Sequence, residues 1–158
     1  MGVNTVEPCL CALRQSDPGI FLLAGRYTLM ETMPLADLSP LCAQRGAHVV
    51  LGGPFNSGFL AGGTHYDYRP GTPEQHAQRE RLRQVAARHH VDLAAAALQF
   101  GLAHPVVAAT IPGASSPEHL RRNAALMDVR IPAAFWEELR AEGLVPPEAP
   151  LPQGQSVS

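Results

Sequence analysis

Three short apolar runs, each followed by a helix-like pattern, constrain the fold of this chain more than any other feature. The runs are 20–25 (IFLLAG), 48–53 (HVVLGG) and 106–109 (VVAA). Continuous runs of this length are typical of strands buried on both faces of a parallel sheet. The order strand, helix, strand, two helices, strand, two helices predicts an α/β protein. Three strands fit either a small doubly wound sheet or part of a larger barrel, and their spacing leaves both open.

Capping residues and the spacing of apolar side chains indicate where the helices lie. Residues 34–45 place leucine and cysteine side chains on one helical face, and Gly46 is suited to end that helix. Asp92 is suited to cap the start of a more apolar helix. The Gly- and Pro-rich residues 62–73 predict a long surface loop. Further helices are expected over 74–90, over 93–104, from Pro117 onward and over 131–144.

The length of the chain and the composition of its last residues bound the domain organisation. A chain of 158 residues is long enough for one ordinary domain, which we expect over residues 1–145. Phe135, Trp136 and Leu139 would anchor the last helix of this domain. Residues 146–158 (PPEAPLPQGQSVS) are rich in proline and polar side chains, so we expect a disordered tail there.

Composition argues against several classes of function. The net charge is −2, so the chain lacks the excess positive charge that attracts nucleic acid or an anionic membrane surface. No apolar run approaches the roughly 18 residues of a membrane span, and the first residues lack the apolar stretch of a signal peptide. The 3 cysteines are few and odd in number, so we expect the protein to reside in the reducing cytoplasm. The sequence contains no lysine, so a mechanism that needs one cannot be completed by these residues alone.

The segment 106–123 (VVAATIPGASSPEHLRRN) is the first candidate site. It predicts a strand, a Pro-Gly turn and a helix that begins at Pro117. The helix N-terminus would attract an anion, Gly113 would let the backbone approach a phosphate, and the two serines that follow would supply hydroxyl groups. The alternative is an ordinary capped helix with solvated arginines.

Two further candidates follow the other apolar runs. The segment 52–60 (GGPFNSGFL) comes after a predicted strand, where parallel-sheet enzymes bind ligands, or else it is a tight loop whose glycines need positive φ. Arg26 and Tyr27 also follow a strand, and the alternative for them is a plain strand end. The histidines lack the spacing of a metal site, and residues 64–68 (THYDY) lack a fixed scaffold for acid–base chemistry. We therefore assign no metal ligands.

With these motifs laid out, the sequence resembles the C-terminal half of an aldo/keto reductase. It is most similar to the branch that contains D-threo-aldose, L-fucose and pyridoxal dehydrogenases. The resemblance implies a (β/α)8 TIM barrel that binds NAD(P) at the carboxyl ends of its strands. The three apolar runs would then be strands six to eight with their flanking helices. The motifs that carry the match are 21–30, 52–63, 95–123 and 131–144, together with 2–4 (GVN), which is similar to the piece after the fifth strand.

The resemblance also assigns cofactor-binding residues. Asn4 would hold the nicotinamide carboxamide, and Tyr27 would lie near the nicotinamide. The loop over the pyrophosphate would comprise Gly53, Pro54, Phe55, Asn56, Ser57, Gly58 and Leu60. The adenosine end would be bound by Ile111, Pro112, Gly113, Ala114, Ser115, His119, Arg122 and Asn123.

Departures from the family pattern bear on the choice between NAD and NADP. NADP-preferring relatives often carry lysine at the position of Gly113 and arginine at that of His119. The absence of both removes partners for a 2′-phosphate, so we expect a slight preference for NAD, although Arg121 or Arg122 could take their place.

A second departure bears on catalysis. The family's catalytic Asp, Tyr, Lys and His all precede the region that this sequence resembles, and there the tyrosine is the general acid/base. We therefore assign no catalytic residue and expect an inactive cofactor-binding part of an oxidoreductase for an aldose or aldehyde, truncated before the tetrad. An N-terminal half or a second copy would be its partner. The alternatives are a non-catalytic half-barrel for nucleotide binding or oligomerisation, and a small doubly wound protein.

Overall fold

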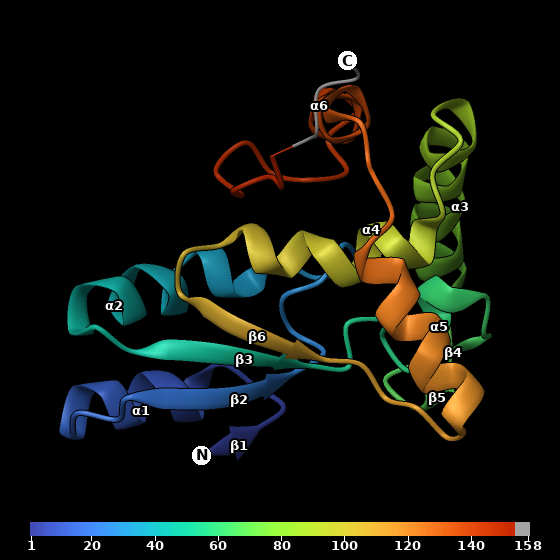
Figure 1. Cartoon of the computed structure of the whole chain (residues 1–158). Coiled ribbons are helices and arrows are strands. Elements are labelled where there is room, and N and C mark those ends of the chain that lie inside the picture. Colours follow the sequence, from blue (N-terminus) through green and yellow to red (C-terminus); the bar gives the residue numbers. More distant parts are fainter. Residues whose placement is uncertain (154–158) are drawn as a thin grey trace.

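A parallel sheet with helices beside it forms the framework of the chain (Figure 1). The structure, a computed structural model, describes residues 1–153. The sheet has four strands in the order β1-β2-β3-β6, and all neighbouring pairs are parallel. Their carboxyl ends therefore lie at one edge, towards α5 and a small hairpin (Figure 1). The strands are β1 (Gly2–Val3), β2 (Ile20–Ala24), β3 (His48–Gly52) and β6 (Val107–Ile111).

Helices connect these strands, and side-chain caps fix several of their ends. Asp92 accepts a hydrogen bond from the Ala94 amide at 2.8 Å, as expected for an N-cap, and Gly46 ends α2 with a left-handed φ of 65°. Three 3₁₀ turns, η1 (Met33–Leu35), η2 (Phe59–Ala61) and η3 (Gly101–Ala103), complete the connections. The helices are α1 (Glu7–Gln15), α2 (Leu38–Arg45), α3 (Pro73–Arg88), α4 (Leu93–Phe100), α5 (Pro117–Met127) and α6 (Ala133–Ala141).

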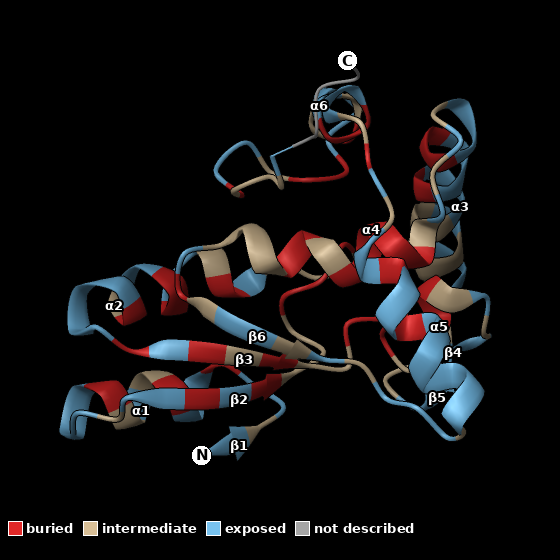
Figure 2. Cartoon of the chain, viewed as in Figure 1, coloured by how far each residue is buried: buried red, intermediate tan, exposed pale blue. Residues whose placement is uncertain are grey.

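Only one face of the sheet is covered, and exposed and buried residues alternate along β2 (Figure 2). In β2, Phe21 and Leu23 are each 1% exposed and belong to the same core cluster as Leu13 of α1, whereas Ile20 and Leu22 are 51% and 40% exposed. Our expectation that these strands are buried on both faces is therefore wrong for this chain. The physical reason is that the helices pack against one side of the sheet, and no described residue covers Ile20 and Leu22 on the other.

The last helix, α6, packs against the core beside α4. The predicted anchors Phe135, Trp136 and Leu139 of α6 are all buried, and the Trp136 and Phe100 ring centroids are 6.4 Å apart. Beyond α6, Ala149 is buried and its carbonyl accepts a hydrogen bond from Arg140 Nη2 at 2.7 Å. Residues 146–153 therefore pack against the core, which corrects the expected disorder there. Residues 154–158 lie outside the described part of the chain.

The structure adds elements that the sequence did not indicate. The strand β1 and the helix α1 occupy a region for which we predicted neither. Of residues 2–4, Gly2 and Val3 form a strand, and Asn4 follows it. Within the expected surface loop 62–73, β4 (His65–Tyr66) and β5 (Arg69–Pro70) form an antiparallel hairpin. No helix among residues 1–153 is long and apolar enough to cross a membrane.

Candidate functional site

A first depression opens where three neighbouring strands end. Asn4 follows β1, Gly25 follows β2 and Gly53 follows β3. Ligands of parallel α/β sheets bind at this edge, because the carboxyl ends of the strands converge there. The depression has a volume of about 280 Å³. Its lining residues are Asn4, Ala24, Gly25, Arg26, Gly53, Asn56, Ser57, Asp67 and Tyr68.

A second depression of about 280 Å³ lies where β6 ends and α5 begins. Ser57 lines the first depression and Gly58 lines the second, so the loop 53–63 separates them. His119 and Arg122 of α5 place their basic side chains at the second depression. Its lining residues are Phe55, Gly58, Ala61, Gly63, Gly113, His119, Arg122, Asn123 and Leu126.

The loop 53–63 is held in an unusual backbone conformation. Asn56 and Ser57 have φ values of 48° and 60°, in the left-handed region that residues other than glycine seldom adopt. Local bonds support it, because the Asn56 amide donates to the Gly53 carbonyl at 3.0 Å and the Leu60 amide to the Phe55 carbonyl at 3.1 Å. The Asn56 side chain is buried, and its Oδ1 has no hydrogen-bond partner within residues 1–153. Asn56 lines the first depression, so a buried acceptor without a partner lies at its wall.

The hairpin β4–β5 reaches the rim of the first depression. Arg26 Nη1 lies 2.9 Å from Asp67 Oδ2, and the Tyr68 amide donates to Ser57 Oγ at 3.0 Å. The Tyr68 ring itself is 90% exposed. In the hairpin, burial raises the pKa of Tyr66 to about 12, and the negative charges of Asp67 and Glu31 add to the increase. The segment 64–68 thus has the scaffold that sequence reasoning denied it, because strand pairing is not visible in so short a motif.

The start of α5 is ordered by its own side chains. Ser116 Oγ accepts a hydrogen bond from the His119 amide at 3.2 Å, and Asn123 Nδ2 donates to the Gly113 carbonyl at 3.1 Å. A methyl group added at Gly113 would meet no atom within 4 Å. Hydrogen bonds from its own backbone amide and from Ser116 lower the pKa of Glu118. This carboxylate already takes up part of the positive potential at the N-terminus of α5. An anion at the second depression would therefore depend on the basic side chains of His119 and Arg122 as well.

The structure does not bring Tyr27 to either depression. The Tyr27 ring is buried against Phe100 and His104, with centroid separations of 5.3 and 5.6 Å. Its hydroxyl has no hydrogen-bond partner in the described part of the chain, and burial raises its pKa. Our placement of Tyr27 near a nicotinamide is therefore not supported, because the chain turns at Gly25, where φ is 67°, and sends the ring into the core. The other predicted residues outside both depressions are Pro54, Leu60, Ile111, Pro112, Ala114 and Ser115.

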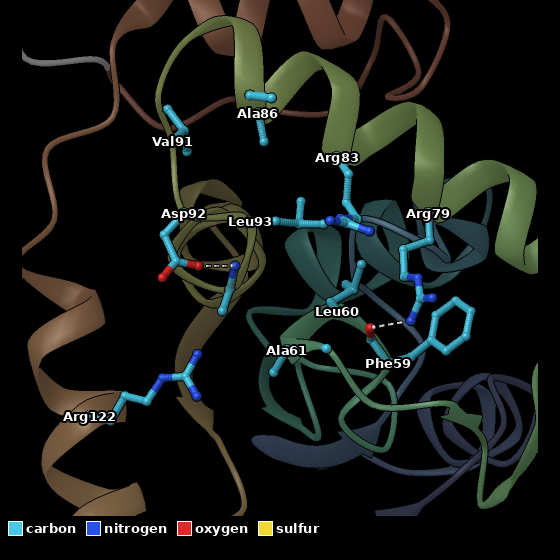
Figure 3. A pocket seen from close by; sticks show the side chains of 13 residues that line it. Phe59, Leu60, Ala61, Arg79, Arg83, Ala86, Val91, Asp92, Leu93 and Arg122 are labelled. Carbon is cyan, nitrogen blue, oxygen red and sulfur yellow. Dashed lines mark hydrogen bonds between the residues drawn. The ribbon is translucent and has the colours of Figure 1, made fainter.

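A larger cleft of about 480 Å³ lies beside the second depression, between η2, α3, α4 and α5 (Figure 3). Ala61 and Arg122 line both. Arg79 and Arg83 of α3 add two further guanidinium groups to the cleft. Sequence reasoning missed them, because charged side chains on an amphipathic helix are usually solvated and no local pattern marks those that turn towards a loop.

The chain matches known proteins over most of its length. The aldo/keto reductase family model matches residues 3–142. The chain is 40% identical to a pyridoxal 4-dehydrogenase of Microbacterium luteolum over 149 residues, which are 92% of this chain and 44% of that protein. It is 34% identical to a D-threo-aldose 1-dehydrogenase of a Pseudomonas species, over 85% of this chain and 43% of that protein. The chain thus spans less than half the length of the curated relatives that it matches.

A solved structure agrees with this assignment at the level of the fold. The holo form of an aldo-keto reductase from Bacillus halodurans superposes with a TM-score of 0.68 at 23% identity. The alignment covers 96% of this chain and 50% of that protein. From the family match and the relative that is 40% identical, we conclude that this chain belongs to the aldo/keto reductase family.

Proposed function

We propose that this chain is the dinucleotide-binding part, equivalent to the C-terminal half of a (β/α)8 barrel, of an NAD(P)-dependent oxidoreductase for an aldose or aldehyde. The observation that carries the proposal is the gathering of separate chain segments at one sheet edge. Asn4, the loop 53–58, Gly113 and the α5 residues His119 and Asn123 meet in two depressions on either side of one loop. An α/β sheet binds a dinucleotide in this manner, with its two nucleotides across such an edge.

The residues present fit the two ends of a nicotinamide dinucleotide. Asn4 and the unpaired Oδ1 of Asn56 offer amide groups to a carboxamide at the first depression. His119 and Arg122 offer basic side chains to phosphate at the second, and the open space at Gly113 admits it close to the backbone. When bound, the nicotinamide supplies the hydride transfer of the complete enzyme. The preference for NAD that we expect from Gly113 and His119 remains part of the proposal.

Substrate and catalysis belong to the complete enzyme. The names of the relatives, pyridoxal 4-dehydrogenase and D-threo-aldose 1-dehydrogenase, support a small carbonyl compound or sugar as the substrate. No lysine occurs in these 158 residues, so we propose that the family's acid–base tetrad is supplied by residues outside them. The unpaired cysteines Cys9, Cys11 and Cys42 support a reducing compartment such as the cytoplasm.

One observation favours a second candidate, a non-catalytic module that associates through its sheet. Ile20, Leu22 and Ile111 are exposed on the strands, and an apolar patch of this kind marks an association surface. In this case the partner is a second copy or a separate N-terminal half, and bound nucleotide would serve structure rather than turnover.

A calorimetric titration of the purified chain with NAD tests the first proposal. We expect saturable binding that Arg122→Gln weakens several-fold, because the variant removes a cation from the second depression. Arg121→Gln is the matched control, since its side chain lines neither depression and its nearest carboxylate, Glu118, is 3.8 Å away. An equal loss of affinity in both variants would attribute the effect to the overall positive charge of α5 rather than to the second depression. An absence of binding by the unaltered chain would exclude the site.

A further inference from the structure

Arg79 makes a set of contacts that the cofactor site described above does not include. Its Nη1 donates to the carbonyl oxygens of Phe59 at 3.2 Å and Gly63 at 2.6 Å (Figure 3 draws the first). Its guanidinium carbon also lies 4.3 Å from the centroid of the Phe59 ring. A cation stacked on a ring face and bonded to two carbonyls is fixed in both position and orientation.

The two carbonyl groups belong to the loop that separates the depressions. Within the loop, the Ala61 and Gly63 amides both donate to the Gly58 carbonyl, at 3.0 and 2.9 Å. These bonds are local to the 58–63 end of the loop. The other end is tied to the sheet, where the Gly53 amide donates to the Ile111 carbonyl at 3.2 Å. Arg79 lies on α3, beyond the hairpin, and therefore links the loop to a separate, well-packed helix whose Leu82, Val85 and Ala86 are buried.

The loop keeps a backbone conformation that depends on contacts from the surrounding structure. Asn56 and Ser57 keep left-handed backbone angles, and such residues persist only where surrounding contacts determine them. Without Arg79, the Phe59 and Gly63 carbonyls would lose their bonds to α3, and the 59–63 end of the wall between the depressions would be held less firmly. Both depressions depend on this wall, since it contributes Asn56 and Ser57 to the first and Gly58, Ala61 and Gly63 to the second.

We propose that Arg79 is a positioning residue that holds the loop 53–63 in the conformation that receives the dinucleotide. It touches neither depression and acts through the Phe59 and Gly63 carbonyls. The choice of arginine follows from geometry, because a planar guanidinium stacks on a ring while it donates in its own plane, which an ammonium group does not. The inference rests on the proposed function, since the ligand it concerns is the nicotinamide dinucleotide.

Arg83 provides a matched control for a binding measurement. It lies one turn further along α3 and lines the same cleft, but its ion pair is an exposed one with Glu80 at 3.4 Å. In calorimetric titrations of the full chain with NADH, we expect Arg79→Met to raise Kd roughly tenfold and Arg83→Met to change it less than twofold. Arg79→Lys should give an intermediate Kd, because it keeps the positive charge but loses the planar guanidinium group that donates two hydrogen bonds. An equal loss in both methionine variants would assign the effect to the positive field of the cleft and overturn the proposal.

Hydrogen exchange tests the same inference without a nucleotide. In Arg79→Met, and to a smaller degree in Arg79→Lys, the Leu60, Ala61 and Gly63 amides should exchange on the order of tenfold faster, while the amides of β3 keep their rates. Unchanged exchange in the loop, or equal acceleration in β3, would show that Arg79 does not position this segment. If the unaltered chain fails to bind NADH, the proposed function is wrong, and the exchange rates alone decide whether Arg79 holds the loop.

Discussion

Replacement of Gly113 by glutamate places a negative charge where the proposed site receives phosphate. The position tolerates the change, because a Cβ atom added there meets no atom within 4 Å and the φ of Gly113 is not in the left-handed region. The Gly113 carbonyl still accepts from Asn123, so the turn before α5 keeps its bond. A loss of binding would therefore report on the ligand rather than on the fold.

The size of the effect follows from Coulomb's law. A carboxylate about 6 Å from a phosphate charge costs about 0.7 kcal/mol in water and about 2.8 kcal/mol at an effective dielectric constant near 20. Since the second depression is open to solvent on one side, we expect about 1–3 kcal/mol, which is roughly a 5- to 150-fold rise in Kd.

A fluorescence titration with NADH measures this change, and circular dichroism checks the fold of each variant. Gly19→Glu is the matched control, because it adds the same charge at a position with equal space, just before β2 and away from the carboxyl edge. An unchanged affinity in a well-folded Gly113→Glu variant would mean that α5 is an ordinary capped helix and that the adenosine end does not bind there.

Further expectations concern association, catalysis and pH. The exposed Ile20 and Leu22 should make the isolated chain associate in sedimentation experiments, and Leu22→Ser should reduce the associated fraction; a monomer that melts cooperatively would argue against this. The purified chain should not oxidise aldoses with NAD or NADP, because it has no lysine for the acid–base set, and turnover that resists removal of host enzymes would refute this. Burial lowers the pKa of His104, so the unfolded state binds a proton more readily than the folded state. The free energy of unfolding is therefore kept above pH 6.5, the pKa of the unfolded state, and falls as the pH drops below it. His104→Gln should flatten the decline of Tm between about pH 7 and pH 5.

Sequence patterns predicted the elements whose signals are local. The strands at β2, β3 and β6 follow from continuous apolar runs, and the caps at Asp92 and Gly46 follow from side-chain chemistry that acts within one turn. The strand β1 escaped notice because a segment of two residues has no periodicity to detect. The apolar runs by themselves suggested burial on both faces, because such a run does not say whether other chain segments cover both sides. The open face was expected only from the resemblance to half of a barrel.

For the candidate site, the sequence indicated which segments contribute residues but not how their side chains are arranged. Resemblance to the family selected Asn4, Gly58, Gly113 and Asn123, and the structure brings all four to the depressions. The direction of Tyr27 follows the turn before it and the packing of its ring against Phe100 and His104. Such directions depend on contacts between residues far apart in the sequence, which spacing does not encode.

The two ends of the candidate site are held by unequal means. The second depression rests on a helix with a side-chain cap and on the bond from Asn123 to the Gly113 carbonyl. At the first depression, Asn4 follows an edge strand of 2 residues whose main link to the sheet is its pairing with β2, supported by the bond from the Leu22 amide to the Met1 carbonyl at 2.8 Å. Short edge strands fray more readily than capped helices that pack on a core, because fewer bonds break when they open. Under the proposed assignment, the adenosine end is therefore the one that the described residues hold more firmly, and the nicotinamide end depends more on the short strand β1.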